Sequence, residues 1–345
     1  MASVELKREP ADPSKADKDS EHVAYAKALG AKALIGTVTY PLTFAKTLFQ
    51  LGYEPYPLST GRVFIFFGRE AYFLPNAFQY LRNVYNEHGL SAIFRGAEAG
   101  FLGTVVGGVS SYAFEKYIDE YYPDIGGNPD NVDKADEELT DYESFKVHVR
   151  AAIRQSLSHT IGLIVQRPLN VLMFREIAQH IGGESKYTNA LCGILRVGDE
   201  EGPAGLFSGL IPALLTELLL VVGVQAVSYT AERVLLHLER NNKDDKQAVD
   251  TIQNLRKASK LLVPFLVTGW SYPYSVCSTV MSVTGSNLVV SLLPYAPLHG
   301  HWTDAYHYLK PHGLTRGNRL FLREQKGAVS VGSDHQLYAS NKFFI

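Results

Sequence analysis

Cysteine is scarce in this sequence, and the common signatures of enzymes are absent from it. The 345 residues include only Cys192 and Cys277, whose wide separation gives none of the short spacings found in metal sites. Free thiols in a reduced compartment are the simplest interpretation. The chain also has no P-loop, no G-x-S-x-G motif and no H-E-x-x-H motif. We therefore predict that it is not an enzyme and that it holds no metal ion or cofactor.

Charge is also sparse and nearly balanced. Lysine and arginine number 33, aspartate and glutamate number 35, and the formal net charge is −2. A nucleic-acid partner is not expected, because nucleic-acid-binding domains carry a basic excess. The mean hydropathy of −0.05 is low for helices that face lipid on all sides. Any membrane helices in this chain must therefore be amphipathic.

The first residues lack the features of a targeting signal. Residues 1–22 have no apolar core, unlike a secretory signal, and they contain Glu5, Glu9, Asp12 and Asp17, whereas mitochondrial presequences are poor in acids. If the protein is mitochondrial, its targeting information is expected to lie within the mature chain. We predict that residues 1–22 form a disordered tail.

What the sequence does contain is a proline motif that occurs three times. It reads TYPLTFAK from Thr39, VQRPLNVLMFR from Val165 and WSYPYSVCS from Trp270. The prolines are 127 and 105 residues apart, which is close to the period of a threefold membrane repeat. A proline inside a helix removes a hydrogen bond and bends the chain. We therefore predict a kink in the first helix of each repeat, at Pro41, Pro168 and Pro273.

A glycine motif follows each proline. It reads EHGLSAIFRG up to Gly96, EEGPAGLFSG up to Gly209 and, in shortened form, PHGLTRG up to Gly317. Each repeat is predicted to contain a proline helix, a loop with a short amphipathic helix, and a second helix that starts after the glycine. The segment after Gly317 is too polar and broken to form such a helix, so the third repeat stops halfway.

The long helices are therefore expected at Tyr25–Leu51, Ala97–Tyr121, Phe145–Ile181, Leu210–Glu239 and Ala258–Asn287. Each is long enough to cross about 30 Å of hydrocarbon. The predicted units after the N-terminal tail are repeat 1 at 23–122, an acidic linker at 123–143, repeat 2 at 144–240, a charged linker at 241–257, a truncated repeat 3 at 258–323 and a C-terminal tail at 324–345.

These motifs resemble those of the mitochondrial solute carrier family, whose repeat reads P-x-[DE]-x-x-[KR] followed by [DE]-G-x(4-5)-[FY]-[KR]-G. The resemblance implies an all-α membrane protein with a threefold helical repeat, here with the sixth transmembrane helix missing or degenerate. The acids that follow the prolines in carriers are replaced by Thr43, Asn170 and Ser275. Of their basic partners only Lys46 remains, because Met173 and Ser278 occupy the other two positions. In carriers these acid–base pairs form a gate, so no ionic gate is expected here.

The broken repeats, together with LFQLGYEPYP, GGESKY and LTRGNRLFLR, are similar to the mitochondrial carrier homolog group of the outer membrane. This resemblance implies a multi-pass protein of the mitochondrial outer membrane that inserts α-helical, often tail-anchored, proteins. Its implied partners are these clients, membrane lipids and apoptotic regulators. Two alternatives remain open: a solute carrier with an altered gate, and a surface docking receptor or lipid scramblase that uses the same groove.

Four of the five predicted helices carry a polar stripe at helical spacing, which indicates a groove that is not filled by lipid. Glu217 is the clearest member, because it lies among leucines, where an acid at mid-membrane costs about 2.5–3.5 kcal/mol. Serine and threonine can instead bond a neighbouring helix, and Lys46 can extend to the headgroups. The candidate groove residues are Lys46, Thr43, His159, Gln166, Asn170, Glu217, Gln225, Tyr272, Ser275 and Thr279.

We predict that the purified protein, reconstituted in liposomes, does not exchange metabolites. Thr43, Asn170 and Ser275 stand where a carrier gate needs acids, so alternating access has no ionic lock. The measurement is counter-exchange of nucleotides or carboxylates. A rate well above that of empty liposomes would support a solute carrier instead.

Overall fold

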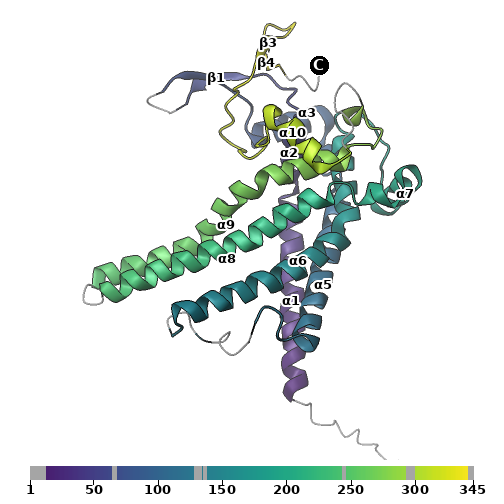
Figure 1. The fold of residues 1–345 in the computed structure, drawn as a ribbon. Coiled ribbons are helices and arrows are strands. Elements are labelled where there is room, and N and C mark those ends of the chain that lie inside the picture. The colour runs from purple at the N-terminus through teal and green to yellow at the C-terminus, as the bar shows by residue number, and fades with distance from the viewer. Residues whose placement is uncertain are drawn as a thin grey trace, which may run out of the picture.

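The computed structural model describes residues 13–63, 68–127, 134, 138–242, 246–292 and 300–340, and within them helices predominate (Figure 1). The long helices are α1 (Pro13–Val38), α5 (Ala97–Tyr121), α6 (Asp141–Ala178), α8 (Leu210–Asn241) and α9 (Lys246–Val283). The short helices are α2 (Tyr40–Leu51), α3 (Ala77–His88), α4 (Leu90–Ile93), α7 (Ala190–Leu206), the 3₁₀ helix η1 (Val289–Ser291) and α10 (Trp302–His312).

The second helices of the first two repeats begin where the glycine motif predicts. Gly96 precedes α5 and Gly209 precedes α8, with φ angles of 83° and 66°. This left-handed conformation is accessible to glycine at little cost and strains other residues. The predicted helix Ala97–Tyr121 is therefore confirmed as α5, and Leu210–Glu239 is confirmed with two further residues in α8.

The predicted helix Tyr25–Leu51 is instead two helices. The chain leaves helical geometry at Thr39, whose φ and ψ are −86° and 1°, and Pro41 lies in the first turn of α2. Proline is tolerated there because the first amides of a helix have no helical acceptor. Pro168 and Pro273 differ, since they lie inside α6 and α9. Pro41 thus marks a break between helices, whereas the other two prolines lie within continuous helices.

Two segments predicted as flexible are partly helical. Helix α1 already starts at Pro13, so residues 13–22 do not belong to a disordered tail, while residues 1–12 lie outside the described residues. Helix α1 is held on α5 from Glu21 onward, because Glu21 pairs with Lys116 and His22 Nδ1 lies 2.8 Å from the Tyr112 hydroxyl. These long-range contacts cannot be seen in local composition.

The charged linker 241–257 is also corrected, because α9 begins at Lys246. Its first turns bury Ile252 and place Arg256 between two acids of α8, Glu232 and Glu239. The acidic linker ends at Thr140, whose side chain and that of Glu143 form a capping box before α6. The part of this linker at 128–133 and 135–137 lies outside the described residues.

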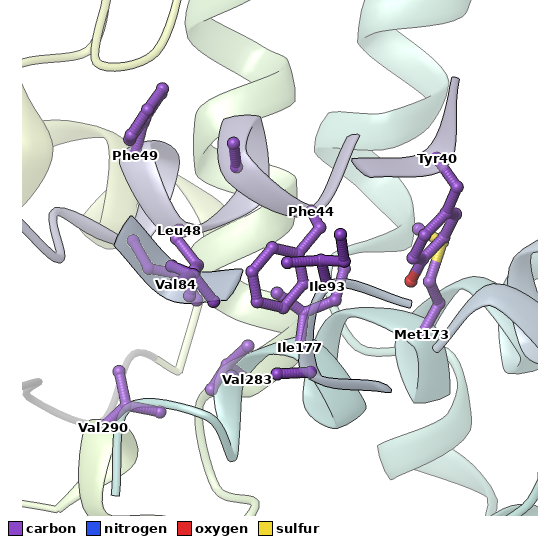
Figure 2. Packing of buried hydrophobic residues seen from close by; sticks show 14 of the residues in the cluster. Tyr40, Phe44, Leu48, Phe49, Val84, Ile93, Met173, Ile177, Val283 and Val290 are labelled. Carbon is purple, nitrogen blue, oxygen red and sulfur yellow. The ribbon is translucent and has the colours of Figure 1, made fainter. Parts of the chain in front are cut away.

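The long helices pack in sequence: α1 on α5, α5 on α6, α6 on α8, and α8 on α9. In Figure 1, α8 and α9 run side by side away from α1 and α5, and the short helices gather at the end where α2 lies. Helix α2 touches both α6 and α9 there. The main core fills this end with Phe44 and Leu48 of α2, Val84 of α3 and Ile177 of α6 (Figure 2). We call this end the base.

The chain after α10 returns to the first repeat. Residues 313–325, which we call the C-terminal strap, run between α9 and α2: the Tyr272 hydroxyl donates to the Arg316 carbonyl (2.8 Å), and the Ala77 amide donates to the Leu320 carbonyl (2.8 Å). Arg323 stacks 3.5 Å from the Phe49 ring centroid and pairs with Glu54. The strap therefore joins the third repeat to the first.

The predicted C-terminal tail 324–345 is ordered as far as the structure describes it. Strands β3 (Val329–Val331) and β4 (Leu337–Ala339) form an antiparallel hairpin, as do β1 (Ser59–Arg62) and β2 (Glu70–Phe73). The Leu58 amide donates to the Leu337 carbonyl (2.6 Å), which connects the tail to the loop before β1. Residues 341–345 lie outside the described residues.

Helices α5 and α6 approach closely through glycine. An added Cβ at Gly162 would lie 2.8 Å from the Gly107 carbonyl oxygen and 3.0 Å from Ser111 Cβ. We predict that Gly162→Ala lowers the free energy of unfolding by about 1–3 kcal/mol, because backbone cannot move aside as a side chain can. Thermal unfolding in detergent micelles measures this effect.

The matched control is Gly36→Ala on α1, where an added Cβ meets nothing within 4 Å. Alanine removes backbone freedom from the unfolded chain and is expected to leave stability equal or slightly higher. If both substitutions had the same effect, close approach of α5 and α6 would not be a requirement of the fold.

Candidate functional site

The polar residues predicted on α6 and α8 meet across the contact between these helices. His159 Nδ1 lies 2.6 Å from Glu217 Oε1, and Gln225 Nε2 donates to Gln155 Oε1 at 3.0 Å. We call these four residues the polar seam. The side chains of His159 and Glu217 remain 46% and 29% exposed, so the seam is open to the surface.

The seam continues towards both ends of the two helices. At the base, Arg167 of α6 donates to the Ser208 carbonyl (3.1 Å) just before α8, and it also donates to Ser282 Oγ (2.8 Å). At the other end, the Tyr229 hydroxyl of α8 donates to the Asp141 carbonyl at 3.2 Å. Polar contacts therefore follow the α6–α8 interface over most of its length.

A second set of predicted residues converges on the amide of Gln50 in α2. Thr279 Oγ1 donates to Gln50 Oε1 (2.9 Å), while Gln50 Nε2 lies 3.2 Å from the Tyr272 hydroxyl and 3.5 Å from Ser275 Oγ. Lys46 Nζ lies 5.2 Å from the centroid of the Tyr272 ring, within the range of a cation–π contact. We call these five residues the polar floor.

The polar floor is sealed rather than open. Tyr272 and Thr279 are buried, and Lys46 is half-buried. The strap covers this site, because an added Cβ at Gly317 would lie 3.1 Å from the Tyr272 hydroxyl and 3.2 Å from the Lys46 carbonyl. Burial lowers the pKa of Arg316 in the strap to about 10. The polar side chains here hold α2 and α9 together.

The other predicted residues are dispersed. Gln166 and Asn170 pack against glycines of α5, where an added Cβ at Gly103 would lie 3.1 Å from Asn170 Oδ1. An added Cβ at Gly107 would likewise meet the side chain of Gln166. Thr43 is exposed. The structure thus joins Glu217 to His159 and Lys46 to Tyr272, but it does not gather the ten predicted residues into one groove.

Two buried arginines at the base end of α6, Arg167 and Arg175, were not among the predicted residues. Arg175 is fully buried; its Nη2 lies 2.8 Å from Glu201 Oε2, and its Nε donates to the Ser282 carbonyl at 2.9 Å. Arg167 is 2% exposed. Both arginines lie within the second proline motif, one on each side of Pro168, and these charges in an apolar segment were the signal that could have found them.

Outside the seam, much of the helical surface is apolar. Leu261, Phe265 and Trp270 of α9 are 71–80% exposed, and Ile211 and Val222 of α8 are about half exposed. Of the described helices, α8 alone is long and apolar enough to cross a membrane by length and composition, and little of its apolar stretch is buried. Such faces suit contact with lipid or with apolar helices.

The described residues contain no group of three or more histidine, cysteine, aspartate or glutamate side chains that could hold a metal ion. The polar seam and the polar floor offer hydrogen-bonding and charged groups: one carboxylate with its imidazole, two amides, and a lysine over an aromatic ring.

Known proteins are similar to this chain in sequence. The family described as mitochondrial carrier protein matches residues 22–125. Human mitochondrial carrier homolog 2 is 30% identical over 295 residues, covering 83% of this chain and 90% of that protein. Mouse mitochondrial carrier homolog 1 is 26% identical over 335 residues, covering 94% of this chain and 81% of that protein. The repeated proline and glycine motifs, the helices that they specify and this similarity show that the chain belongs to the mitochondrial carrier homolog family.

Proposed function

We propose that this protein inserts α-helical, tail-anchored proteins into the mitochondrial outer membrane, and that the polar seam is the path of the client's hydrophilic tail. The observation that carries the proposal is the partly exposed His159–Glu217 pair between helices whose outer surfaces are apolar. The family relationship indicates a mitochondrial membrane, and the outer membrane with several crossings is our more specific proposal.

The physical problem in such a reaction is the tail. Polar groups that leave water without new partners cost about 2–7 kcal/mol each, depending on the reference state. The seam offers a carboxylate, an imidazole and two amides along one interface. A tail that moves along it exchanges water for these groups instead of losing its partners altogether.

The driving force requires no cofactor. Burying the apolar helix of a client in lipid yields about 25 cal/mol for each Å² of apolar surface. A seam that is open at the side lets that helix leave into the bilayer while the tail is still held. The partners of this activity are therefore tail-anchored clients and membrane lipids; we also propose apoptotic regulators as partners, on the family resemblance alone.

The solute carrier alternative has less support. The polar floor is closed by contacts between α2, α9 and the strap, and the acids of a carrier gate are absent. A lipid scramblase could use the same seam, and a fluorescent lipid assay on the same liposomes separates that activity from insertion.

We predict that Glu217→Arg lowers insertion of a tail-anchored client at least about threefold. The substitution reverses the charge of the seam and adds a bulky cation beside His159, and at the proposed depth in the membrane a low dielectric strengthens the effect of charge. The assay is protease protection of a fluorescent client in liposomes that contain the purified protein. Glu217→Gln, which keeps a hydrogen-bonding group, is expected to lower insertion by a smaller factor.

The matched control is Glu120→Arg, the same chemical change at an exposed position near the end of α5. It is expected to insert at the parental rate. If Glu217→Arg folds normally, as judged by its thermal unfolding, and also inserts at the parental rate, then the seam is not the path of the tail.

A further inference from the structure

We propose that His159 is a specificity-determining residue of the polar seam: it occupies one oxygen of Glu217 and so limits the retention of client tails that carry arginine or lysine. This inference rests on the proposed function and names the property of the client that the seam senses. The new role belongs to the histidine that contacts the Glu217 carboxylate, since the carboxylate itself is already part of the proposed path.

The His159 imidazole and the Glu217 carboxylate bond to each other in the structure. The His159 Nδ1–Glu217 Oε1 distance of 2.6 Å is that of a strong hydrogen bond. The neighbouring members of the seam, Gln155 and Gln225, are uncharged and bond to each other. Arg167, the next cation after His159 along α6 towards the base, donates to Ser208 and Ser282. The charge of the seam is therefore set by this one pair.

A free carboxylate is a strong binding site for a passing cation. Arginine engages both oxygens through two parallel hydrogen bonds, and lysine donates to either oxygen. When an imidazole already donates to one oxygen, that oxygen has one acceptor site fewer for an incoming guanidinium or ammonium, and the ring fills the space on that side of the carboxylate. His159 thus leaves Glu217 able to replace water for a tail while preventing it from holding a basic tail firmly.

The pair also ties α6 to α8, and that structural role makes a different prediction. A lost helix contact would change the affinity for every tail by a similar factor, whatever its charge. Loss of the histidine that occupies the carboxylate would change the affinity for basic tails and leave the affinity for acidic tails little affected. The ratio of the two affinities therefore separates the two roles.

The experiment uses the full chain in nanodiscs of uncharged phosphatidylcholine and two fluorescent peptides. Both carry the same apolar helix, followed by three arginines in one and by three aspartates in the other. We expect His159→Ala to raise the affinity ratio of the arginine peptide to the aspartate peptide by about three- to tenfold. His159→Gln, which can still donate to the carboxylate, should raise the affinity ratio by a smaller factor. It replaces His159→Ala in the test if the alanine variant fails to fold.

Two further variants complete the test. Gln155→Ala breaks the neighbouring bond of the seam without touching Glu217, and it should leave the ratio at the parental value. Adding Glu217→Gln to His159→Ala should also restore the parental ratio, because no carboxylate remains to be unmasked. An unchanged ratio in His159→Ala, or an equal rise in Gln155→Ala, would overturn the inference.

The proposed function is tested separately by insertion of a tail-anchored client into liposomes. If the parent inserts the client but the affinity ratio does not respond to His159, the role of His159 is wrong and the function stands. If the parent neither inserts the client nor binds either peptide, both proposals fail.

Discussion

Two buried guanidinium groups of α6 hold the base of this molecule together. Arg175 joins Glu201 of α7 to the Ser282 carbonyl of α9, and Arg167 joins the Ser208 carbonyl before α8 to the Ser282 hydroxyl. A buried charge that loses its partner destabilises a fold by about 3–5 kcal/mol. These contacts therefore connect α6 to α7, to the start of α8 and to the end of α9.

This base differs in kind from the gate of a solute carrier. In the carrier family, acid–base pairs between the proline helices open and close, whereas here Thr43, Asn170 and Ser275 replace the acids. The buried arginines bond instead to carbonyls, a hydroxyl and a glutamate on a short helix. The polar floor and the strap add further links between the first and third repeats. A base of this kind is suited to stay closed, which leaves the sides of the helices as the surface where the protein can act.

The fold could be predicted wherever the deciding signal was local. Gly96 and Gly209 mark the starts of α5 and α8 because a few neighbouring residues are enough to predict a left-handed glycine before an apolar helix. The break at Thr39 was missed because a proline can kink a helix or begin one, and only the packing of α2 at the base distinguishes the two. The helical start of α9 was missed because it depends on Arg256 meeting two acids of α8.

The sequence by itself determined the three spaced proline motifs, the family, the residues that stand in place of the gate acids and the presence of an acid among the leucines of α8, because each of these is a matter of residue type and spacing. Only the tertiary structure decided which polar residues share a site. Residues on one stripe of a helix cover an arc wide enough to face two neighbours, so Gln166 packs on α5 while His159 meets Glu217 on α8. For the same reason Tyr272 and Thr279 close the floor around Gln50 instead of lining a groove, since the pairing of α2 with α9 connects residues more than 200 positions apart.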